Sequence, residues 1–181
     1  MARLSPREDL LSLLFNLGAG EYRNEDFYLN NAGCLFFSKE PSVRFIHTGV
    51  VCGLYKGTGK TTILDRKEFN GTLTENVDAS LLFLKQHLKL RFEITGVDAR
   101  RREKLEIPEV ALREAIINAV THRDYFEKGA QVMIEIFDDR VEISNPGGLP
   151  RALPPDQFGK RSVCRNRPYP QCPRRSRMQT A

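Results

Sequence analysis

The pattern of apolar and polar positions predicts amphipathic helices at two places in the first half of the chain. The first begins at the capping-box sequence Ser5–Glu8, continues through leucines at helical spacing and ends at Gly18. The second begins at another capping box, Thr72–Glu75, and carries a single apolar stripe. The residues of the stripe are Leu73, Val77, Leu81, Leu84 and Leu88. Their steps of three and four positions are typical of a helix that packs on a core.

Runs of β-branched and aromatic residues predict strands between these helices. Residues 43–55 and 61–69 have this character, and the stretch Lys56–Lys60 suits a hairpin connection between them. Residues 29–39 predict a short buried helix that ends before Pro41. A strand is the alternative there, because Cys34–Phe37 is apolar on every side.

The pattern continues with a helix, a hairpin and a glycine-rich loop. Residues 108–125 predict a helix, and alternating residues over 132–143, with a tight turn at Asp138-Asp139, predict the hairpin. The loop is Asn145–Pro150. The expected apolar face of the helix consists of Val110, Leu112, Ile116, Ile117 and Val120.

A charged stretch at residues 100–104 marks the expected boundary between two lobes. We therefore expect an α/β (α+β) fold with two small lobes, over residues 1–104 and 105–166. Residues 167–181 have no apolar periodicity and predict a basic, disordered tail.

The charge of the chain is concentrated near its C-terminus. The 181 residues carry a net charge of +5, but seven basic residues and no acidic residue follow Asp156. Residues 1–156 hold 21 basic and 23 acidic residues, so the body is almost neutral and offers no argument for a DNA-binding surface. The apolar runs are short and no signal peptide is evident, so we expect a cytoplasmic protein without a membrane span. Four cysteines without a CxxC pair predict reduced thiols rather than a zinc site.

The stretch Gly53–Thr62 contains Gly59-Lys60-Thr61, the last three residues of a phosphate-binding P-loop. The first glycine of that motif falls at Leu54, one position away from Gly53. A P-loop also opens a helix, whereas β-branched residues follow here. We interpret the stretch as a hairpin turn, with Lys56 and Lys60 as surface contacts for anions.

A better candidate for chemistry lies on the helix over 108–125. Glu114 and Asn118 are four positions apart and share a face, and Thr121 and His122 follow one turn later. An amide oxygen can bind Mg²⁺, and a carboxylate can act as a general base on water. On the spacing alone, a solvated helix face is the favoured interpretation.

The segments "ALREAIINAVTHRDY", "VMIEIFDDRVEISNPGGLP" and "FGKRSVCRN" resemble a bacterial and archaeal family of transcriptional regulators. These ATP-binding proteins are related to the C-terminal part of RecG-type helicases, and their module is placed in the GHKL ATPase superfamily. Full-length members carry it after an AlbA-type (Schlafen-like) DNA-binding domain. The stretches "NNAGCLFFSKEP" and "YKGTGKTTILDRKEFNGTL" extend the resemblance over nearly all of residues 25–166.

The resemblance implies a role for each matching residue. Glu114 would activate water as the catalytic residue, Asn118 would hold Mg²⁺, and Asn145 would contact the adenine of ATP. The backbone at Gly147 and Gly148 would lie close to the nucleotide. His122 and Arg123 are further candidates for nucleotide binding. A contact with a partner chain or a role in the fold at the helix C-terminus is the alternative for these two residues.

The sequence also departs from the family pattern. Asn145 replaces an aspartate, Leu149 occupies the place of a glycine, and a later glycine-rich phosphate box is absent from the sequence. Without that box, stabilisation of the transferring phosphate is lost, which argues against turnover. After Asn166 the family pattern stops, so a frameshift there is one hypothesis, and a basic tail that contacts nucleic acid is the other.

The resulting functional expectation is the truncated C-terminal portion of an ATP-binding transcriptional regulator, which binds Mg²⁺-ATP weakly or not at all. A non-catalytic module for dimerisation or assembly of such a regulator is the alternative. A homodimer is the partner considered, and contact with DNA is expected only through a separate domain or partner.

Overall fold

The computed structural model describes residues 9–93, 102–148 and 156. Its centre is a four-stranded sheet in the order β4-β3-β7-β8. The strands are β3 (Val50–Tyr55), β4 (Ile63–Phe69), β7 (Val132–Ile136) and β8 (Val141–Ser144). β3 runs parallel to β7, with Cys52 opposite Ile134, and the two hairpins β3–β4 and β7–β8 are antiparallel. Both predicted hairpins are thereby confirmed.

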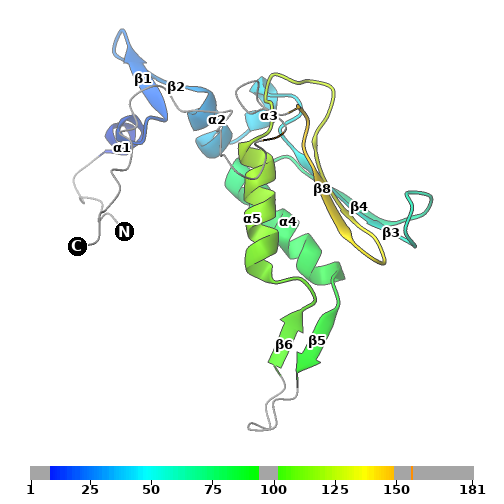
Figure 1. Ribbon diagram of the computed structural model, residues 1–181. Coiled ribbons are helices and arrows are strands. Elements are labelled where there is room, and N and C mark those ends of the chain that lie inside the picture. The colour runs from blue at the N-terminus through cyan, green and yellow to red at the C-terminus, as the bar shows by residue number, and fades with distance from the viewer. Residues whose placement is uncertain (1–8, 94–101, 149–155, 157–181) are drawn as a thin grey trace.

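Two helices, α4 (Leu73–His87) and α5 (Glu109–Thr121), lie side by side against this sheet (Figure 1). The predicted capping box opens α4. Thr72 Oγ1 accepts a bond from Glu75 N (3.3 Å), and Glu75 Oε2 accepts one from Thr72 N (2.8 Å). All residues of the predicted stripe are buried, and they pack against the alternate residues of β3 and β7 that face the helices. The core therefore lies between one face of the sheet and the two helices.

The apolar face predicted for α5 is only partly correct. Leu112, Ile116 and Val120 are buried, whereas Val110 is 81% exposed and Ile117 is also exposed. At 100° per residue, positions 110 and 117 share a face that is turned away from the buried one. The helix also ends at Thr121 rather than at residue 125, because the chain turns there to meet the loop that follows β8.

The N-terminal elements are α1 (Leu10–Asn16), β1 (Gly20–Arg23), β2 (Asp26–Leu29), α2 (Asn31–Phe37) and α3 (Pro41–Arg44). Asp9 caps α1 by accepting a bond from Ser12 N (2.7 Å), and the predicted capping box at residues 5–8 lies outside the described residues. Gly18, with φ +68°, ends this helix as predicted. The helix predicted within residues 29–39 is confirmed by α2. The strand predicted from residue 43 begins only at Val50, because Pro41 starts a helical turn.

The predicted boundary at residue 104 does not divide the described structure. The central sheet joins β3, from the first predicted lobe, to β7, from the second, and α4 packs on α5. Part of the charged stretch 100–104 belongs to β6 (Arg102–Leu105), which pairs with β5 (Leu90–Glu93). The expected α/β class is correct, but the two lobes share one sheet and one core. The predicted tail lies outside the described residues.

Candidate functional site

Glu114 and Asn118 lie on the exposed face of α5. Both side chains are exposed, and Asn118 Nδ2 donates a hydrogen bond to Glu114 Oε1 (3.1 Å). This bond uses the amide nitrogen of Asn118 and not the amide oxygen, which is the atom that Mg²⁺ would require. The predicted pair therefore lies on one helix face, where a carboxylate and an amide oxygen are available as metal ligands.

The glycine-rich loop contacts the chain just beyond the end of α5. Asp124 N donates a hydrogen bond to Pro146 O (3.3 Å), and Asn145, Gly147 and Gly148 are exposed around this contact. Gly147 has φ +99°, a conformation that favours glycine, and a Cβ built on Gly148 would meet no atom within 4 Å. The structure thus brings the loop to the C-terminal end of α5. Glu114 lies further back on the helix, about 12 Å before residue 122 at 1.5 Å per residue.

His122 and Arg123 differ in what they can offer to a ligand. His122 is half-buried, and its N–H donates to Asn118 O (3.0 Å), which closes the helix. The Arg123 side chain is only 1% exposed, and its Nη2 donates to Ala130 O (2.9 Å) and Glu127 O (3.3 Å). We therefore expect Arg123 to hold the fold of this segment rather than to contact a nucleotide directly.

The Tyr125 side chain contacts both Arg123 and the last turn of α5. The Arg123 guanidinium lies 5.0 Å from the centre of the Tyr125 ring, and Tyr125 Oη donates to Val120 O (2.7 Å). Burial raises the pKa of Tyr125 to about 12 and lowers the pKa of Arg123. The segment after α5 is consequently anchored to the end of the helix on one side and to the glycine-rich loop on the other.

The P-loop-like stretch Gly53–Thr62 consists of the end of β3 and the hairpin connection to β4, which confirms the predicted turn. Its backbone is already bonded to the β7–β8 turn. Gly57 N donates to Asp138 Oδ2 (3.0 Å), and Asp138 N donates to Gly57 O (3.0 Å). Because a P-loop binds phosphate through such N–H groups, the bond from Gly57 N takes a donor away from that role.

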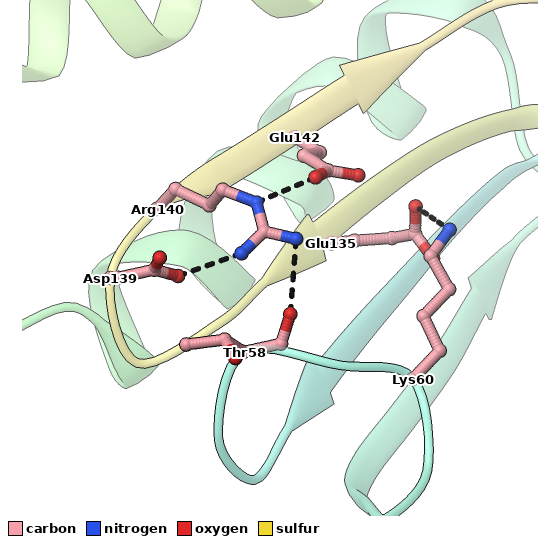
Figure 2. Close-up of polar contacts among 6 residues, drawn as sticks. All are labelled: Thr58, Lys60, Glu135, Asp139, Arg140 and Glu142. Atoms are coloured by element: carbon pink, nitrogen blue, oxygen red, sulfur yellow. Dashed lines mark hydrogen bonds and ion pairs between the residues drawn. The ribbon is translucent and has the colours of Figure 1, made fainter.

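The charged side chains near this connection are also paired with one another (Figure 2). Lys60 Nζ lies 2.6 Å from Glu135 Oε2, and this carboxylate raises the pKa of Lys60. Arg140 donates from Nε to Glu142 (2.6 Å), from Nη1 to Asp139 (2.8 Å) and from Nη2 to Thr58 O (3.1 Å). The anion that Lys60 contacts is thus a carboxylate of the protein itself.

Sequence reasoning missed Glu135 and Arg140 as partners of this turn. Glu135 is 2% exposed and interrupts the apolar strand Val132–Ile136, which was the available signal. Its position opposite Gly53 follows from the parallel pairing of β3 with β7, two segments far apart in sequence.

A metal site built by the protein alone is not found among the described residues, where no group of three His, Cys, Asp or Glu side chains converges. Glu114 and Asn118 do fit Mg²⁺, because carboxylate and amide oxygens are hard donors and Mg²⁺ is usually bound by one or two protein ligands together with phosphate and water. Cys34 and Cys52 are buried free thiols. No helix within the described ranges has the length and apolar character needed to cross a membrane.

Comparison with known proteins supports an ATPase-type family for the C-terminal part. Residues 129–178 match the family described as "Putative ATP-dependent DNA helicase recG C-terminal". The match contains β7, β8 and the loop at residues 145–148 and begins after α5. It continues past Asn166 to residue 178, so it gives no support to a frameshift at that residue.

The fold is shared with a solved structure. The chain is similar to the DIP2311 protein from Corynebacterium diphtheriae, with a TM-score of 0.70 and 24% sequence identity. The alignment covers 88% of this chain but 31% of that protein, so this chain spans about a third of its length. A comparison with curated proteins gives no match. Together, the findings connect this chain to an α/β fold and to RecG-C-terminal-like ATPase domains.

Proposed function

We propose that this chain is the nucleotide-binding portion of a transcriptional regulator and binds Mg²⁺-ATP across α5 and the loop at residues 145–148. The observation that carries the proposal is the position of the Glu114–Asn118 pair on the helix whose end holds that loop. The separation along α5 suits an extended ligand, with its base at the loop and its phosphates toward the pair.

Each group has a chemical role in this arrangement. The amide oxygen of Asn118 would hold Mg²⁺, which neutralises phosphate charge when bound, and Glu114 would orient a water molecule. The amide of Asn145 would hydrogen-bond to the base, and the exposed backbone at Gly147 and Gly148 would allow close approach. Because Asn145 offers the base an uncharged amide in place of the family's aspartate, we expect weak binding.

Calorimetric titration of Mg²⁺-ATP into the purified chain tests this function. Asn118→Ala should abolish the binding heat, and Glu114→Gln should leave most of it. Val110→Ser is the matched control, because Val110 is 81% exposed on the same helix and has no proposed role. Absence of heat from the unmodified chain, or equal binding by Asn118→Ala, would refute the proposed site.

A non-catalytic module for dimerisation or assembly is the second candidate. It is favoured by the large apolar side chains exposed on the N-terminal elements, which include Leu10, Phe15, Leu17, Tyr22 and Tyr28. Under this function the chain would be a homodimer in light scattering, and Phe15→Ser would make it monomeric. Glu114→Gln would then change neither assembly nor its dependence on ATP.

Contact with DNA is proposed to reside in a separate domain or partner. The described body gives no basic surface by composition, and the basic residues after Asp156 are the alternative source. If the separate-domain proposal holds, this chain should not bind DNA, either with or without residues 167–181. Binding by the full chain that is lost, together with its salt dependence, on removal of residues 167–181 would assign the contact to the tail.

A further inference from the structure

Phe126 is the most exposed of the large apolar side chains in the described part of the chain, at 82%. An exposed apolar side chain means little by itself, since many are found on protein surfaces. Phe126 is of interest because of its position, two residues after Asp124, whose N–H bonds to the glycine-rich loop.

The backbone around Phe126 is held in place by short-range hydrogen bonds. Phe126 N donates to Asp124 Oδ1 (3.0 Å), while Asp124 N donates to Pro146 O (3.3 Å). Glu127 N donates to Asp124 O (3.3 Å), and the buried Arg123 holds Glu127 O (3.3 Å) from the other side. The ring is therefore exposed on a fixed support and not on a loosely attached loop.

The glycine-rich loop lies on the other side of the Asp124–Pro146 bond, and its residues Gly147 and Gly148 are exposed. Gly147 follows Pro146 directly, and the space in front of Gly148 is open. Asn145 adds an exposed amide, which can both donate and accept hydrogen bonds. A planar heteroaromatic base can stack on an aromatic ring, lie against exposed peptide groups and form hydrogen bonds with an amide.

We propose that Phe126 is the stacking platform for the base of the nucleotide and determines specificity for base-containing ligands over polyphosphate alone. The inference rests on the proposed Mg²⁺-ATP site and adds to it the residue that would recognise the base. Phe126 contributes ring contact, whereas Asn118 acts on the phosphates through Mg²⁺.

Paired titrations with Mg²⁺-ATP and Mg²⁺-tripolyphosphate test the inference. Phe126→Ala should weaken ATP binding about tenfold, within the roughly five- to hundredfold range typical of base stacking, and leave tripolyphosphate binding unchanged. Phe126→Tyr should bind ATP like the unmodified chain. Because the ring is exposed, these variants should fold normally, which circular dichroism checks.

A direct optical signal is available because the chain contains no tryptophan. The Phe126→Trp variant would carry one indole, whose fluorescence should change on addition of ATP and not on addition of tripolyphosphate. Equal affinity of Phe126→Ala for ATP, or an equal loss for both ligands, would overturn the stacking role.

The Asn118→Ala variant separates the two proposals. It should abolish the binding heat of both ligands, because Asn118 would hold the Mg²⁺ that neutralises the phosphate charge of either one. If Asn118→Ala weakens ATP binding and Phe126→Ala does not, the nucleotide site stands and the stacking platform is wrong. If the unmodified chain binds neither ligand, the proposed function and the inference are both overturned.

Discussion

Replacing Arg123 by methionine separates a structural role from a ligand-binding role at this position. The guanidinium is 1% exposed, donates to the carbonyls of Ala130 (2.9 Å) and Glu127 (3.3 Å), and lies over the ring of Tyr125. Methionine keeps most of the length and apolar volume of the stem but removes the charge and the donors. Arg123→Lys is the companion variant, because it keeps a charge without the planar fork.

The expected loss follows from these contacts. A hydrogen bond to a charged group contributes about 1.5–3 kcal/mol, and a partly desolvated cation–π contact about 1–2 kcal/mol. Removing the buried charge also removes its desolvation cost, which offsets part of this loss. We expect Arg123→Met to lower the free energy of unfolding by about 2–3 kcal/mol, a large part of the 5–15 kcal/mol that is usual for a domain.

Urea denaturation monitored by far-ultraviolet circular dichroism measures this loss. Titration with Mg²⁺-ATP, without urea and at a temperature where the variant is folded, measures binding. Arg123→Lys should lose less stability than Arg123→Met. The structural interpretation is refuted if the free energy of unfolding of Arg123→Met lies within about 0.5 kcal/mol of that of the unmodified chain, the usual range for surface changes, and the variant still fails to bind ATP. That result would make Arg123 a ligand-binding residue.

Three further predictions follow from buried or paired groups. Lys60→Met should lower the stability, because it leaves the Glu135 carboxylate without its counter-ion, and adding Glu135→Gln should restore it. The affinity for ATP should stay unchanged in both variants, and its loss would support the P-loop hypothesis. Burial raises the pKa of Tyr125 from 10.0 to about 12, so its stabilising effect is complete below pH 10 and is lost as the pH rises toward 12. Tyr125→Phe should flatten this alkaline decline, which a series of urea titrations between pH 9 and 12 would show. Burial also raises the pKa of Cys52 to about 11, and the thiol should react with iodoacetamide only after unfolding; fast reaction in the native state would contradict its burial.

Local sequence signals predicted the elements that depend on local physics. The capping box at Thr72 and the leucine stripe predict α4, because both hydrogen bonds of the box form within residues 72–75 and the spacing of the stripe follows the helical period. Alternation over Val132–Ile136 likewise fixes β7, with its even-numbered residues turned to the core.

Periodicity could not reveal where distant segments meet. β3 pairs with β7 across about 80 residues of chain, so the sheet joins segments on either side of the expected boundary at residue 104. The hairpin β1–β2 was not predicted, because its turn residues Asn24 and Glu25 both adopt positive φ without a glycine. The burial of Arg123 could not be inferred either, because it depends on the carbonyls of Glu127 and Ala130, which lie beyond the end of α5.

The two glycine-rich stretches differ in what their polar groups are already bonded to. In the β3–β4 connection, Gly57 N and the Lys60 ammonium are held by carboxylates of the β7–β8 hairpin, so a phosphate would have to displace a bonded anion from each. Displacement from Lys60 would leave the Glu135 carboxylate, 2% exposed, without its counter-ion, and that cost opposes binding. At the loop 145–148, Asn145, Gly147 and Gly148 are exposed, and the backbone is fixed to the segment after α5 through Pro146 O. A phosphate accepts hydrogen bonds and does not compete for this carbonyl. A ligand can therefore approach the loop at residues 145–148 without breaking a buried ion pair. For this reason that loop is a stronger candidate site than the P-loop-like stretch Gly53–Thr62.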